Sequence, residues 1–121
     1  MKKYAYFCAK CQSTKTDPTW AREFAKTIGL DLWVPAEHVV NCKYPDGALE
    51  CFEAIKGAEC VIVQPPVGAD CGWEMGAAHV LGKSTFLLKP LPEDDWMTKI
   101  GVTPCPFGAI EVLRQIRRAE P

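Results

Sequence analysis

The stretch CVIVQPPVGADCGWEMGAAHVLG, residues 60–82, decides the fold. It begins with an unbroken apolar run, Cys60-Val61-Ile62-Val63, which is typical of a strand buried on both faces of a parallel sheet. Pro65-Pro66 ends this strand, because proline cannot donate a hydrogen bond to a neighbouring strand. A glycine-containing loop then leads to a predicted helix over 73–81, and Gly82 stands where helix C-termini favour glycine. The stretch therefore predicts a strand–loop–helix unit.

The same alternation of strands and helices runs through the rest of the chain. Strands covered by helices through short connections are typical of a doubly wound parallel sheet with helices on both faces. We therefore predict a single α/β domain, residues 1–121, with four to five strands, and we assign no element to 36–46. The further predicted strands are 3–8, 32–34, 85–88 and a short edge strand within 102–107; the further predicted helices are 18–28, 48–57, 93–100 and 109–119.

Composition excludes several classes of protein. The chain has 121 residues, of which 48% are hydrophobic and 24% charged, and these values are ordinary for a globular domain. Its formal net charge is −1, so it lacks the basic surplus expected of a nucleic-acid-binding protein. No apolar run approaches the about 18 residues that a membrane span needs, and the residues after Met1-Lys2-Lys3 are typical of a strand rather than of a signal peptide. We expect a cytoplasmic protein that binds neither nucleic acid nor membranes.

The seven cysteines cannot all pair within one chain. We predict reduced thiols that pack as small hydrophobic side chains. Cys8-Ala9-Lys10-Cys11 leaves a second interpretation open, because a CxxC pair at a strand end occurs in redox and metal sites. Cys71 is a candidate third member of such a thiol or metal site.

Acidic residues follow the third strand. In a doubly wound sheet ligands bind beyond the carboxyl ends of the strands, which places the loops 9–17, 35–46 and 64–73 at the site. Asp70 and Glu74 lie four positions apart at the entry to the third predicted helix, and two carboxylates can divide nucleophilic and acid–base work at a glycosidic carbon. We expect Glu74 in the first helical turn, where the helix dipole keeps a carboxylate ionised. Ordinary capping of the helix is the alternative.

The segment 73–83, WEMGAAHVLGK, resembles the E-(I/L)-G-x-A-x-x-x-G-K segment of the nucleoside 2-deoxyribosyltransferase family, which includes the 2′-deoxynucleoside 5′-phosphate N-hydrolases. Tyr6-Phe7-Cys8-Ala9 is similar to the Tyr-Phe-Cys-Gly of the hydrolases, and Ala36-Glu37-His38-Val39 to their Thr-Glu-His-Val. Residues 51–59 match the family's helix before the third strand. The resemblance is collinear from about Tyr4 to Ile116.

The resemblance implies a flavodoxin-like sheet of order 2-1-3-4-5 and chemistry at C1′ of a 2′-deoxyribose. Glu74 would be the nucleophile, Tyr6 would orient its carboxylate, and no metal or organic cofactor would be needed. The 94–96 segment lies where family members reach a neighbouring subunit's site, so a homodimer or higher homo-oligomer is expected. The small-molecule partner would be a nucleoside or nucleotide.

The chain also departs from the family pattern. The aspartate six residues before the nucleophile is replaced by Gly68, with Asp70 as the nearest acid, and the aspartate that holds the sugar is replaced by Cys51. Lys10 lies where the hydrolases bind the 5′-phosphate, and it is either a phosphate ligand or a surface lysine. The implied substrate-binding residues are Cys8, Ala9, Lys10, Gln12, His38, Cys51, Gly68, Gly72 and Trp73.

The remaining aromatic residues and histidines divide between the predicted core and the predicted site. We predict Trp20 and Trp33 in the core and His79 between its helix and the sheet. His38 either contacts the substrate or lies on the surface, and Trp73 either stacks on a base or packs against a neighbouring subunit.

Two functions from different classes follow from these observations. The first is cleavage or transfer at the N-glycosidic bond of a 2′-deoxynucleoside or its 5′-monophosphate. The second is a non-catalytic nucleotide-binding module on the same fold, which the missing aspartates at Gly68 and Cys51 favour.

Overall fold

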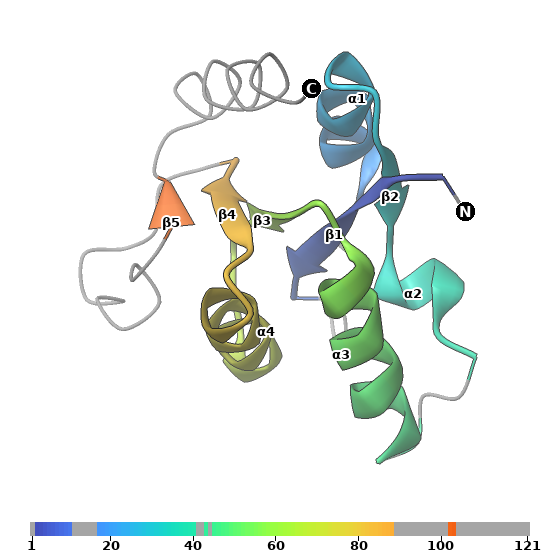
Figure 1. The fold of residues 1–121 in the computed structure, drawn as a ribbon, viewed down its shortest axis with the longest axis vertical. Coiled ribbons are helices and arrows are strands. Elements are labelled where there is room, and N and C mark those ends of the chain that lie inside the picture. The colour runs from blue at the N-terminus through green and yellow to red at the C-terminus, as the bar shows by residue number, and fades with distance from the viewer. Residues whose placement is uncertain (1, 11–16, 41–42, 44, 89–101, 104–121) are drawn as a thin grey trace.

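The computed structural model describes residues 2–10, 17–40, 43, 45–88 and 102–103 (Figure 1). The predicted helices at 93–100 and 109–119 lie outside these residues. So do Gln12 and the 94–96 segment.

The strands form one parallel sheet in the order β2-β1-β3-β4-β5. This confirms the predicted α/β class and the 2-1-3-4-5 order. β1 and β3, the two strands richest in buried apolar side chains, lie next to each other, with β4 beyond β3. The strands are β1 (Tyr4–Ala9), β2 (Asp31–Trp33), β3 (Cys60–Gln64), β4 (Ser84–Leu87) and β5 (Val102–Thr103).

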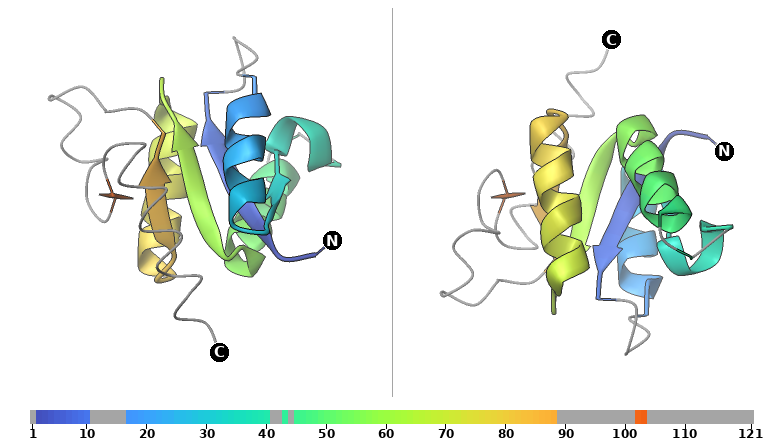
Figure 2. Two further views of the ribbon diagram at one scale, coloured as in Figure 1. Left: turned by 90° about the horizontal axis from the view of Figure 1, so that it is seen from above. Right: turned by 90° about the horizontal axis from the view of Figure 1, so that it is seen from below.

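Helices cover both faces of the sheet, as predicted. Figure 2 shows α1 on one face, and α3 and α4 side by side on the other. α1 packs through an apolar stripe of period 3.6, whereas α4 buries a stripe that contains an acid, Glu74. The helices are α1 (Thr19–Thr27), α2 (Pro35–His38), α3 (Asp46–Gly57) and α4 (Ala69–Val80).

The alternation of β1 places two polar side chains on the face under α3 and α4. Successive side chains of a strand point to opposite faces. Phe7 packs in the core cluster with α1, whereas Tyr6 and Cys8 belong to the cluster formed with α3 and α4. Both are fully buried. A tyrosine and a cysteine therefore face the buried side of α4.

Two helix boundaries differ from the prediction. α4 begins at Ala69 rather than Trp73, because Gly68 has an extended backbone and the helix carries Gly72 in its first turn despite the low helix propensity of glycine. Glu74 is consequently in the second turn, so the expected position in the first turn is wrong. α2 forms in the unassigned stretch, with Pro35 at its start, where the missing N–H costs nothing.

Two side-chain predictions are also wrong. Trp20 is 42% exposed, because the buried stripe of α1 is centred on Ala21, Phe24 and Ala25 and leaves Trp20 at its edge. His79 is exposed, because it follows the buried Ala78 and is turned about 100° around the helix from it.

Two glycines of the α4 region should respond oppositely to alanine. Gly82 has φ of 73°, and an added Cβ would meet no atom within 4 Å, so only the backbone opposes Gly82→Ala. We expect the free energy of unfolding to fall by about 1 kcal/mol. Gly76 lies within α4 in equally open space, so Gly76→Ala should raise the free energy of unfolding by about 0.5–1 kcal/mol. Urea unfolding of both variants measures the difference, and changes of the same sign would contradict this account.

Candidate active site

The centre of the candidate site is a contact between β1 and α4. The Tyr6 hydroxyl donates a hydrogen bond to the Glu74 carboxylate. Tyr6 is fully buried and Glu74 is 6% exposed. The structure thus brings together two predicted site residues that lie far apart in the sequence.

Burial controls the ionisation of Glu74. Removal from water raises the pKa of its carboxyl from an ordinary 4.5 to about 8. The expectation that the helix dipole keeps this carboxylate ionised is therefore wrong, because Glu74 lies beyond the first turn and inside the core cluster. The hydrogen bond from Tyr6 favours the ionised form, but desolvation outweighs it.

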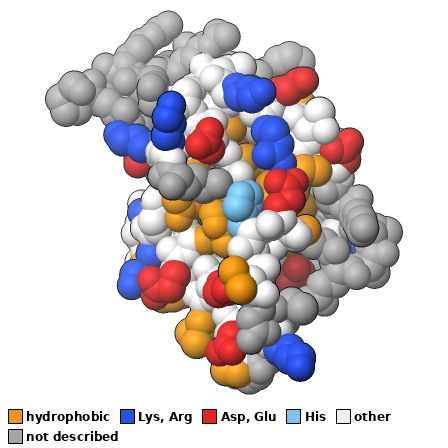
Figure 3. Space-filling view, turned by 90° about the vertical axis from the view of Figure 1, so that its right-hand side faces the viewer, with side chains coloured by type: hydrophobic (Ala, Val, Ile, Leu, Met, Phe, Trp, Pro, Cys, Tyr) orange, Lys and Arg blue, Asp and Glu red, His pale blue; other side chains and the backbone are white. Residues whose placement is uncertain are grey.

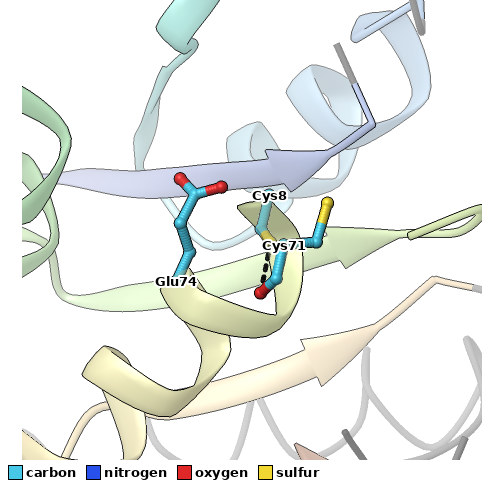
Figure 4. Close-up of side chains that lie close together, drawn as sticks. All are labelled: Cys8, Cys71 and Glu74. Atoms are coloured by element: carbon cyan, nitrogen blue, oxygen red, sulfur yellow. Dashed lines mark hydrogen bonds between the residues drawn. The ribbon is translucent and has the colours of Figure 1, made fainter. Parts of the chain in front are cut away.

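Two cysteines lie beside Glu74. The Cys8 thiol donates a hydrogen bond to the backbone carbonyl of Cys71, with a sulfur–oxygen distance of 3.7 Å. Figure 4 shows Cys71 and Glu74 on α4 with Cys8 close to them on β1. A separate interaction between the Cys8 side chain and the Cys71 thiol lowers the pKa of that thiol. Among the described cysteines, Cys8, Cys51, Cys60 and Cys71 form no disulfide; Cys8, Cys60 and Cys71 are buried, as predicted, and Cys51 is half-buried. Cys11 lies outside the described residues.

A second group of predicted residues meets at the N-terminus of α4. A Cβ added to Gly68 would lie 3.1 Å from Asp70 Oδ1 and 3.6 Å from Lys10 Cγ. Lys10 therefore runs beside the Gly68 backbone, next to Asp70. Burial raises the pKa of the Cys51 thiol, with smaller contributions from Glu50 and Asp70. This effect places Cys51 of α3 within electrostatic range of Asp70.

An aromatic stack leads from Glu74 towards an open pocket. Tyr6 and Trp33 are register partners on neighbouring strands, and their rings stack with centroids 5.3 Å apart. The His38 ring stacks on Trp33 at 5.5 Å. Trp33 is only half-buried: it packs against the core cluster, as predicted in part, and it also forms part of the pocket wall.

The pocket has a volume of about 660 Å³ and lies between α3 and the aromatic stack. Figure 3 views the molecule from the side of β2 and α2, where a histidine lies among hydrophobic, acidic and basic side chains. Tyr6 connects the pocket to Glu74, because its ring contacts Trp33 while its hydroxyl contacts Glu74. The lining residues include Tyr4, Trp33, His38, Asp46, Glu50 and Glu53.

Sequence reasoning missed the acidic wall of this pocket. Asp46, Glu50 and Glu53 follow one another at intervals of four and three residues, which places them on one face of α3. That spacing was visible in the sequence.

The other predicted substrate-binding residues lie outside the contact between Tyr6 and Glu74. Ala9 is buried in the cluster with α1, so only its backbone faces the strand ends. Gly72 lies within α4 rather than in a loop. Trp73 is 52% exposed and contacts Phe52 of α3, with ring centroids 6.2 Å apart.

No helix in the described part of the chain is long and apolar enough to cross a membrane. No family model matches the sequence, and no curated protein matches it significantly. Among solved structures, the chain is similar to a 2-desoxiribosyltransferase from Leishmania mexicana, with a TM-score of 0.66 and 13% sequence identity. The match covers 98% of this chain and 99% of that chain. At this identity the likeness shows a common fold.

Proposed function

We propose that the chain cleaves or transfers at the N-glycosidic bond of a 2′-deoxynucleoside or its 5′-monophosphate, through a covalent deoxyribosyl–Glu74 intermediate. The observation that carries this proposal is the buried Glu74 carboxylate held by the Tyr6 hydroxyl. The similarity in fold to a 2-desoxiribosyltransferase along nearly the whole chain supports it.

The chemistry begins with attack of the Glu74 carboxylate on C1′. The C1′–N bond breaks, the base leaves with the electron pair, and Asp70 or water supplies a proton to it. Water or a second base then attacks C1′, and the Glu74 carboxylate leaves. Two displacements give net retention at C1′, and a carboxylate stabilises the oxocarbenium-like transition state of each. No cofactor is required by this scheme.

We assign recognition of the substrate to two regions of the site. The Trp33–His38 stack and the pocket beside it offer flat rings to a base. Lys10, beside Gly68, offers a cation to a 5′-phosphate. Cys51 replaces the carboxylate that would hold the sugar, so we assign sugar binding to the backbone around Gly68 and to Asp70.

Activity should rise with pH. The nucleophile must be ionised, and burial raises the pKa of Glu74 to about 8. Below that pH the ionised fraction falls about tenfold per pH unit, so kcat/KM should fall in proportion and level off above about pH 8. The profile is measured from about pH 6 to about pH 9 in the presence of a chelator. A rate that stays constant over this range would contradict the raised pKa.

Tyr6→Phe should slow the reaction and move its pH profile. The variant keeps the ring that stacks on Trp33 but loses the hydrogen bond to Glu74. We expect kcat to fall by about 10–100-fold and the inflection of the profile to move to higher pH, because the ionised carboxylate loses a donor.

Tyr4→Phe is the matched control for this variant. Tyr4 lies two residues away on the same face of β1, and its hydroxyl donates to the Ala54 carbonyl at 2.7 Å rather than to Glu74. The inflection in the pH profile of the Tyr4→Phe variant should stay at the wild-type pH. Equal shifts in both variants would argue against a specific role for Tyr6.

The function itself is tested with a panel of deoxynucleosides and their 5′-monophosphates, with and without an acceptor base. Chromatography should detect free base, and a new nucleoside in the presence of acceptor would identify transfer rather than hydrolysis. A folded protein that binds members of the panel without turnover would instead support the nucleotide-binding module. Light scattering of the same sample tests the expected homo-oligomer.

A further inference from the structure

We propose that Cys8, Cys71 and Glu74 together bind one thiophilic divalent cation, with Zn²⁺ as the natural candidate. One ligand atom from each residue lies within 4.8 Å of the other two, and all three side chains are buried. Figure 4 shows the three residues close together between β1 and α4.

The backbone brings these ligands together in a fixed arrangement. Cys71 and Glu74 are three residues apart on α4 and therefore lie on the same helix face. Cys8 approaches from the neighbouring strand β1. A tetrahedral zinc ion with bonds of about 2.0–2.3 Å holds its ligand atoms about 3.5–3.8 Å apart. A contraction of about 1 Å is within reach of side-chain rotation.

The charge of the site also favours a cation. Within the described residues Glu74 accepts a hydrogen bond from Tyr6 and forms no ion pair. An ionised carboxylate buried without a positive partner is unfavourable, and a divalent ion can take the place of the proton that Glu74 otherwise holds.

The donor set selects the kind of ion. Two thiolates and one carboxylate suit zinc, whereas calcium and magnesium prefer oxygen ligands alone. Three protein ligands leave the fourth position of a tetrahedral ion to solvent. The carboxylate has two oxygens, so Tyr6 can keep one while the ion takes the other, in the manner of an outer-shell partner.

A bound ion would change what Glu74 can do. A carboxylate oxygen that coordinates zinc has lost the electron density needed for attack on C1′, so the metal-bound protein should be inactive. This consequence rests on the proposed function. Binding of the ion does not.

Binding is tested on the metal-free full chain with Co²⁺, whose thiolate charge-transfer absorption reports cysteine ligation, followed by displacement with Zn²⁺ in a calorimeter. We expect one ion per chain. Loss of an outer-shell partner already weakens metal sites by about 10–100-fold, so Cys8→Ser and Cys71→Ser should weaken binding at least about 100-fold, and Glu74→Gln at least about tenfold.

Cys60→Ser is the matched control, because Cys60 is a buried strand cysteine in the cluster with α1. It should bind the ion as the wild type does. Circular dichroism verifies that each variant is folded, and Cys71→Ala provides a second variant should the serine disrupt packing. Absence of a thiolate band in the wild type, or equal binding by all the variants, would overturn the proposal.

Measuring base release with and without zinc distinguishes failure of the metal site from failure of the proposed function. Zinc should suppress base release by the wild type, and chelator should restore it. If zinc binds through these residues but the metal-free protein releases no base, the metal site stands and the glycosidic function fails. If base is released and zinc neither binds nor inhibits, the metal site fails alone.

Discussion

Glu74→Gln should abolish base release, with a fall in kcat of at least about a thousandfold. Glutamine fills the same volume and can still pair with the Tyr6 hydroxyl, but its amide oxygen is too weak a nucleophile to form a bond to C1′. The rate is measured by chromatography of free base, with chelator present, at a pH of about 8 where the wild-type carboxylate is substantially ionised. Because the change is nearly isosteric, the lost rate reports chemistry rather than packing.

Glu23→Gln is the matched control for this substitution. Glu23 is exposed on α1, which covers the opposite face of the sheet, so its loss should leave the rate at the wild-type level. Release of base by Glu74→Gln at more than about a tenth of the wild-type rate would rule out Glu74 as the nucleophile.

The same Glu74→Gln variant should be more stable than the wild type at neutral pH. In the folded protein burial raises the pKa of Glu74 from 4.5 to about 8, so the folded state holds a proton that the unfolded state releases. The raised pKa therefore stabilises the folded wild type fully below about pH 4.5, and this stabilisation is lost as the pH rises towards about 8. Glutamine does not titrate, so the stability gap in favour of the variant should widen by about 3 kcal/mol between about pH 4 and about pH 7.

Urea unfolding of both proteins across this pH range measures the gap. The exposed Glu23→Gln should produce no widening. If the free energies of unfolding of Glu74→Gln and wild type changed with pH in parallel, Glu74 would ionise normally in the folded state. That result would also contradict the expected pH dependence of activity.

Much of the fold could be predicted because its signals are local. The apolar run of β3 is bounded by Pro65-Pro66, and α4 ends at Val80, two residues before the positive-φ Gly82, so these boundaries require no tertiary information. The start of α4 was misplaced because Gly68 and Gly72 both resemble loop residues, although only Gly68 lies outside the helix. The four-residue helix α2 is too short for a periodic pattern.

The site was predictable only in part, because its chemistry depends on packing. A resemblance in sequence selected Tyr6 and Glu74, and the structure places them in contact. The charge state of Glu74 could not be predicted, since its burial comes from β1 and not from its own helix. The approach of Cys8 to Cys71 likewise depends on the pairing of β1 with β3 and on how α4 lies across both strands.

The most direct test of the central claim is mass spectrometry of the protein quenched in acid during turnover of a deoxynucleoside, followed by peptide mapping. We expect one deoxyribosyl group on the peptide that contains Glu74, and none on the Glu74→Gln variant. A deoxyribosyl group on any other residue, or full base release by Glu74→Gln in the same experiment, would contradict the account.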